Sequence, residues 1–124
     1  MLSQAYPFIR RYGLVSQSSY PYQGIQSKCH KHLLSNPTAT VESWGLIVPK
    51  SEENMELVLR TLGPIAVGLD GTDPLFLSYK GGIFDGENCS RHHPNHAMLI
   101  VGMGEEYDEE SKETIKYWIA RYVL

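Results

Sequence analysis

The sequence predicts an α+β fold, with helices in the first half of the chain and an antiparallel sheet in the second half. Apolar residues recur at helical spacing only before residue 63. After that point the apolar segments are short, rich in β-branched and aromatic residues, and separated by glycines and acidic turns. Because runs of helices precede runs of strands, the pattern is typical of α+β proteins. At 124 residues, the chain is long enough for one domain with a core of its own.

Two segments are expected to be helical. The first runs from Gln4 to Tyr12 and ends at Gly13. The second begins after Ser51, whose hydroxyl is a good N-cap, and ends at Gly63-Pro64. Its first turn is acidic, which suits the positive end of a helix dipole. Its apolar stripe consists of Met55, Val58, Leu59 and Leu62.

Everything after the second helix is expected to be strand and turn. Residues 65–69 form an apolar run closed by Asp70-Gly71, which predicts a buried strand. Residues 76–84 are rich in turn formers. Two further strands are expected at residues 96–101 and 115–124. The acidic segment between them, "EEYDEESKET", predicts a solvated hairpin loop.

Charge and hydropathy exclude two classes of partner. The net charge is −3, whereas a nucleic-acid-binding domain calls for a basic face. The apolar runs are too short to span a bilayer, so no membrane partner is expected. The first residues, "MLSQ", lack the basic and apolar stretches of a signal peptide.

Cysteine and histidine form two small clusters. One contains Cys29, His30 and His32. The other contains Cys89, His92, His93 and His96. Zinc accepts thiolate and imidazole ligands, so a zinc-stabilised domain is one interpretation. The spacing does not match a recognised zinc knuckle, and a polar loop explains it more simply. We therefore expect no metal and no other cofactor.

A succession of motifs resembles the second half of the papain family of cysteine peptidases, the cathepsin-like enzymes. "GLVSQSSYPYQG" resembles the family's segment leading to Tyr-Pro-Tyr. "GPIAV", "YKGGIF", "NHAMLIVGMG" and "KYW" follow in the family's order. The similarity therefore covers nearly the whole chain. It implies a partial papain-like fold, with the end of the helical left domain in residues 1–34 and the β-rich right domain in residues 35–124.

The resemblance assigns roles to individual residues. His96 matches the catalytic histidine, which pairs with a cysteine thiolate and later protonates the leaving amine. Asn95 and Ala97 match the usual neighbours of that histidine. Gly68 and Ala97 match residues that line the main specificity pocket, and Asn95 is placed with them as a pocket residue. The expected substrate is a peptide or protein. The implied location is the lysosome or the cell exterior.

The nucleophile does not match any residue of this chain. In the family, the catalytic cysteine lies roughly 130–150 residues before the histidine, which is more than the distance from Met1 to His96. Cys29 and Cys89 instead match family cysteines that form disulfides, here with partners outside the chain. A direct Cys29–Cys89 bridge is the alternative. The missing N-terminal half of the catalytic domain is therefore an expected partner.

The last residues also depart from the family pattern, which continues after the Lys-Tyr-Trp motif into an asparagine that orients the histidine. Tyr122 stands at the asparagine position. With neither this asparagine nor the cysteine, the chain alone is expected to be inactive. The alternative is a non-catalytic homologue that binds peptides or inhibitors.

Overall fold

The computed structural model describes residues 2–87, 89–90 and 92–121. It divides into two compact units, Met1–Leu46 and Ile47–Leu124, each of which is described by itself. Unit 1 contains α1 (Leu2–Tyr12) and the short 3-10 helix η1 (Lys31–Leu34). Unit 2 contains α2 (Glu52–Thr61), β1 (Ile65–Leu69), α3 (Pro74–Leu77), β2 (His96–Asp108) and β3 (Glu113–Arg121).

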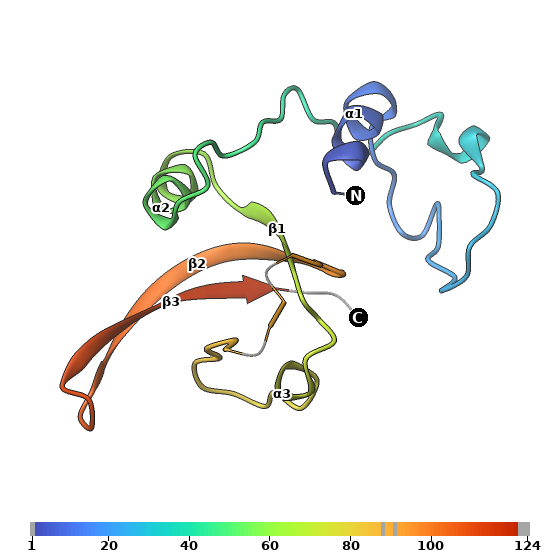
Figure 1. Ribbon diagram of the computed structural model, residues 1–124. Helices are drawn as coiled ribbons and strands as arrows, with labels where there is room; N and C mark the ends of the chain where they lie inside the picture. The colour runs from blue at the N-terminus through green and yellow to red at the C-terminus, as the bar shows by residue number, and fades with distance from the viewer. Residues whose placement is uncertain (1, 88, 91, 122–124) are drawn as a thin grey trace. The chain divides into compact units, whose positions relative to one another are not determined.

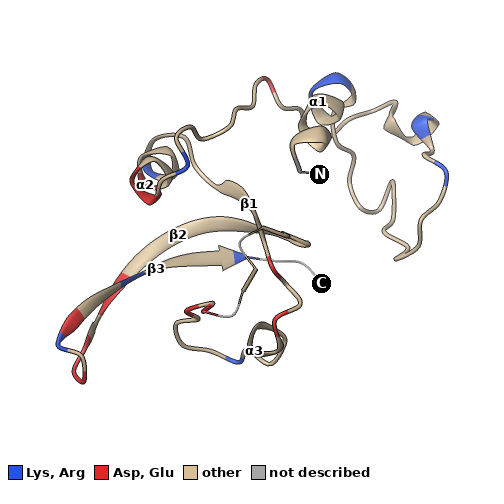
Figure 2. Ribbon diagram, in the orientation of Figure 1, with Lys and Arg blue, Asp and Glu red and all other residues tan. Residues whose placement is uncertain are grey.

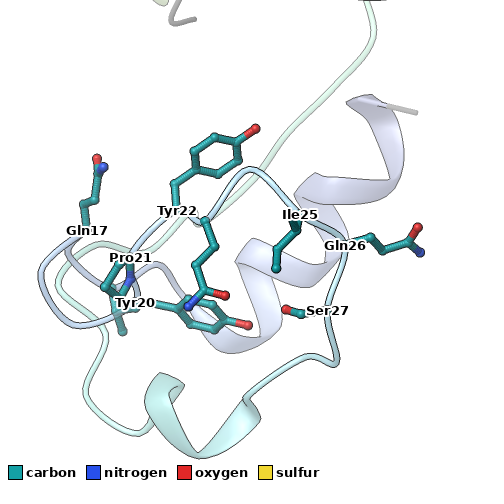
Figure 3. A pocket seen from close by; sticks show the side chains of 9 residues that line it. Gln17, Tyr20, Pro21, Tyr22, Ile25, Gln26 and Ser27 are labelled. Atoms are coloured by element: carbon teal, nitrogen blue, oxygen red, sulfur yellow. The ribbon is translucent and has the colours of Figure 1, made fainter.

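Unit 1 is a helix followed by a long irregular segment. As predicted, α1 ends before Gly13, whose amide donates to the carbonyl of Ile9 at 2.7 Å. Gly13 adopts a φ of 73°, a left-handed conformation that favours glycine. A bridge between Leu14 and Ala39 then closes the irregular segment back onto the end of the helix. Residues 15–27 curl around an open hollow with no charged side chain in its lining (Figure 3).

Unit 2 begins with α2, which forms as the sequence predicts. The Ser51 hydroxyl accepts a hydrogen bond from the amide of Asn54 at 3.2 Å and so caps the helix. Glu52 and Glu53 occupy the first turn. The chain passes from α2 through Gly63-Pro64 directly into β1.

The sheet has three antiparallel strands in the order β1–β2–β3 (Figure 1). Ile65 pairs with Ile100 in register, and these two are the buried apolar side chains of the described residues. The same register places Leu69, the last residue of β1, opposite His96, the first residue of β2. A shift of register lies between Ile100 and Gly102 in β2.

Three expectations about the second half were wrong. The strand expected at residues 96–101 continues to Asp108. The strand expected from residue 115 starts at Glu113. Most of the acidic segment is therefore strand, and only residues 109–112 form the turn at the hairpin's acidic end (Figure 2). Alternating side chains can point to solvent from a strand as readily as from a loop, so acidity alone did not distinguish the two.

The number of helices was also underestimated, because α3 and η1 were not predicted. Asp73 caps α3 by accepting from the amides of Leu75 and Phe76 at 2.7 and 3.2 Å. Pro74 then occupies the first turn, where a missing amide hydrogen costs nothing. Helices of four residues have too few positions to show a periodic pattern.

Candidate active site

His96 is the first residue of β2 and contacts an aromatic side chain of α3. Its ring centroid is 5.8 Å from that of Phe76 in α3. Phe76 in turn contacts Phe84 edge to face, at 5.7 Å between ring centroids. The His96 side chain is half-buried, with its Nε2 atom shielded from solvent. The imidazole therefore belongs to an aromatic cluster contributed by β2, α3 and the loop that follows α3.

Asn95 fastens the backbone directly before His96. Its amide N–H donates to the carbonyl of Leu69 at 3.0 Å, which extends the pairing of β1 and β2 by one bond. Its side-chain Oδ1 accepts from the amide of Gly71 at 2.8 Å. Its Nδ2 donates to the Asp70 carboxylate at 2.9 Å. Asn95 thus joins β2 to the turn that follows β1.

The Asp70 carboxylate is the centre of this turn. It is buried, and both of its oxygens accept hydrogen bonds. Oδ1 accepts from the hydroxyl and amide of Thr72 at 2.6 and 3.0 Å and from Asn95. Oδ2 accepts from the amide of Ser90 at 3.0 Å. These donors, with the Thr72 hydroxyl first among them, hold the pKa of Asp70 well below its usual range.

Cys89 lies beside the same turn, with its thiol donating weakly to the backbone carbonyl of Asp70 at 3.9 Å. Burial raises the pKa of the Cys89 thiol, and the negative charges of Asp73, Asp70 and Asp85 raise that pKa further. This environment favours the neutral thiol, whereas a cysteine nucleophile needs its thiolate stabilised. Cys89 and Cys29 are both free thiols in the structure.

The candidate pocket residues Gly68 and Ala97 lie directly opposite each other in the register of β1 and β2. A Cβ atom at Gly68 would lie 3.1 Å from the Cβ of Pro94, so Pro94 already covers the side on which a side chain would project. Directly opposed residues of antiparallel strands point to the same face of the sheet. Gly68, Ala97 and Pro94 therefore form a small apolar surface.

The structure brings some of the predicted site residues together within unit 2. Gly68, Asn95, His96 and Ala97 meet at one end of the β1–β2 pair, with Cys89 nearby. Cys29 belongs to unit 1. Tyr122 lies outside the described residues. Within the described ranges, no three His, Cys, Asp or Glu side chains gather in a way that could hold a metal ion.

Asp70, Pro94 and Phe76 were missed by sequence reasoning. Asp70 was interpreted only as half of an Asp-Gly turn. Its distance of 25 residues from Asn95 gave no local signal, because the two meet only through strand pairing. The Asp-Gly-Thr order did offer a hint, since Asp side chains commonly accept from the amide two residues later.

Comparison with known proteins identifies the chain. Residues 1–122 match the profile of the papain family cysteine proteases. The chain belongs to the papain family. Cathepsin 7 of Mus musculus is 34% identical over 88% of this chain, and rat procathepsin L is 30% identical over 98%. The chain spans about a third of the length of these relatives, 32% and 35% respectively.

The papain-like fold is also found among solved structures. Digestive procathepsin L 3 from the larval midgut of Tenebrio molitor matches 94% of this chain, with 29% identity and a TM-score of 0.75. Procathepsin L2 from the same tissue gives 31% identity and a TM-score of 0.66. The matches cover 36% and 35% of those chains. The helices and antiparallel sheet described above are therefore part of a papain-like fold.

Proposed function

We propose that these 124 residues are the histidine-bearing part of a papain-like cysteine peptidase. His96 would act as the imidazolium partner of a cysteine thiolate and then protonate the leaving amine of a peptide or protein substrate. The observation that carries the proposal is the position of His96. It starts a paired strand, is held from behind by Asn95, and stands in the Asn-His-Ala motif of a chain that belongs to this family.

The rest of the site is proposed from the same resemblance. Gly68, Asn95 and Ala97 would line the substrate pocket, and Gly68 and Ala97 together with Pro94 would give it an apolar surface. Cys29 and Cys89 would form disulfides with residues outside these 124. The left domain would end within residues 1–34 and the right domain would occupy residues 35–124. The protein that carries this segment would work in the lysosome or outside the cell. No helix in the described part of the chain is long and apolar enough to cross a bilayer.

We further propose that the 124-residue polypeptide has no peptidase turnover of its own. Covalent catalysis needs a thiolate that is stabilised near the imidazole. Cys89 has the opposite environment, since burial and three carboxylates raise its pKa. Cys29 is exposed and follows a loop of unit 1. Without a nucleophile, an acyl-enzyme cannot form.

Two measurements on the purified chain test this proposal together. The first is cleavage of a fluorogenic peptide with an apolar residue before the scissile position, and we expect no turnover above buffer. The second is the rate of iodoacetamide labelling of each cysteine, followed by mass spectrometry at pH 5 and pH 8. We expect labelling of both thiols to be much slower at pH 5, because ordinary thiols are protonated there.

The variants Cys29→Ser, Cys89→Ser and His96→Ala provide the controls. Turnover that any one of them abolishes would show that a nucleophile is present within the chain. Rapid labelling of one cysteine at pH 5, lost in His96→Ala, would identify a thiolate–imidazolium pair and would equally refute the proposed inactivity.

A further inference from the structure

We propose that Asp70 is a positioning residue for His96. Its carboxylate would tie Asn95, the residue directly before His96, to the turn after β1, and so fix the direction in which the imidazole points. That this matters for catalysis rests on the proposed function of His96. That Asp70 holds Asn95 in place follows from the hydrogen bonds themselves.

The Asp70 site accepts a carboxylate and little else. All four of its partners are donors: the hydroxyl and amide of Thr72, the side-chain amide of Asn95 and the backbone amide of Ser90. A neutral carboxyl or an amide at residue 70 would turn one donor toward another. Because the group is buried, water cannot readily replace a lost acceptor. The low pKa of Asp70 agrees with this arrangement.

These contacts join two segments that are distant in sequence, the turn after β1 and the loop that leads into β2. Asp70 follows β1, Ser90 belongs to the loop before β2, and Asn95 directly precedes β2. Both ends of the Asn95 side-chain amide form hydrogen bonds, because its Oδ1 also accepts from the amide of Gly71. The main chain at Asn95 is held in addition by Leu69. The residue that precedes the catalytic candidate is therefore held by four hydrogen bonds, three of which depend on its side chain, counting a longer one from Nδ2 to the Thr72 hydroxyl at 3.4 Å.

Removal of this link should release the His96 ring from its neighbour Phe76. The two ring centroids are 5.8 Å apart, close enough for a through-space NMR signal between ring protons. We expect this signal to be lost in Asp70→Ala and also in Asn95→Ala, which leaves Asp70 with its Thr72 and Ser90 donors. Asn95 is exposed, so its replacement should leave the sheet folded.

The variant Asp70→Asn separates positioning from general stability. Its remaining oxygen can keep the Thr72 and Asn95 donors, and its new NH2 group then faces the amide of Ser90. We expect the Ser90 amide resonance to move and the His96–Phe76 signal to remain. As a control for overall loosening, Ser51→Ala removes the distant cap of α2 and should leave both signals unchanged.

The proposal is overturned if the His96–Phe76 signal survives in Asn95→Ala, because the proposed link runs through the Asn95 side chain. It is also overturned if Ser51→Ala abolishes the signal, since the signal would then report loosening of the whole unit. Asn95→Ala decides the matter even where Asp70→Ala fails to fold. Because the readout is not turnover, failure of the peptidase assignment would leave this result standing.

Discussion

At the scale of single residues, Asp70 is the side chain that organises the end of β1. An aspartate is usually found at the surface, but Asp70 is buried and its oxygens accept from Thr72, Asn95 and Ser90. Burial of a charge is tolerated when donors surround it in this way. The turn that carries Asp70 therefore depends on the ionised state of the carboxylate.

This dependence predicts acid sensitivity. The pKa of Asp70 is lower in the folded chain than the value of about 3.9 expected when unfolded. The unfolded state therefore binds the proton first, and the stabilisation is present above about pH 4 and is lost as pH falls below that value. The midpoint of urea unfolding should thus differ between wild type and Asp70→Asn at pH 6, and the difference should shrink below pH 4.

Two other acids help to interpret that experiment. The side chain of Ser111 and the amide of Glu110 lower the pKa of Asp108 too, so both proteins should lose some stability in acid. Asp85 accepts a hydrogen bond from the amide of Glu87 at 3.2 Å, and Asp85→Asn is the matched control. A difference between wild type and Asp70→Asn that stayed constant from pH 6 to pH 3 would contradict the prediction.

At the scale of elements, the long β2–β3 hairpin depends on Gly104, which makes room for a side chain of β3. Gly104 pairs with Tyr117, and a Cβ atom at residue 104 would lie 2.5 Å from the Cζ atom of the Tyr117 ring. Gly102 pairs with Ile119, and a Cβ atom there would meet the Ile119 Cδ1 at 3.4 Å, an ordinary contact. The tyrosine thus lies across the backbone of β2 at Gly104.

We expect Gly104→Ala to lower the free energy of unfolding by about 1–3 kcal/mol, because the added methyl group overlaps the Tyr117 ring. Gly102→Ala, two residues away on the same strand, should have a much smaller effect. Denaturant unfolding followed by Tyr and Trp fluorescence would measure both. In the double variant Gly104→Ala, Tyr117→Ala, the overlap is gone and the penalty of the alanine should disappear. An equal loss in the two single variants would argue against the overlap.

At the scale of the whole chain, the apolar core is small. Within the described residues, Ile65 and Ile100 are the buried apolar side chains, and both belong to the β1–β2 pair. Other apolar side chains of the sheet remain exposed, among them Leu99, Val101 and Ile119 at 38%, 43% and 47%. Extended exposed apolar surface is typical of a surface that another segment covers. This exposed surface agrees with the finding that the chain spans about a third of the length of the curated relatives.

Replacement of a buried isoleucine and of an exposed isoleucine should therefore lower the free energy of unfolding by different amounts. Ile100→Ala removes a side chain that is only 4% exposed, and we expect a loss of about 2–5 kcal/mol in the free energy of unfolding. Ile119→Ala should cost clearly less and should reduce the fluorescence of a hydrophobic dye bound to the folded chain. Chemical denaturation and dye titration measure the two effects. Similar losses of stability in both variants would mean that the exposed face is packed in solution.

Features that depend on neighbours along the chain follow from the sequence alone. The Ser51 cap and the apolar stripe specify α2, and the run that precedes Asp70-Gly71 specifies β1, because helix and strand periodicities are local. The motif around His96 likewise pointed to the papain family, which the family match then showed. The acidic segment misled us, since charge indicates exposure and does not separate strand from loop.

Which distant groups meet depends on how the strands pair in the folded chain. The register that places Leu69 opposite His96 brings Asp70 to Asn95, and it places Gly68 opposite Ala97 with Pro94 against it. No local pattern encodes these contacts, because a shift of one residue in the pairing would move every side chain to the other face of the sheet. The physical reason is that strand pairing joins residues far apart in sequence by hydrogen bonds. The residues between the two strands do not specify which residue pairs with which.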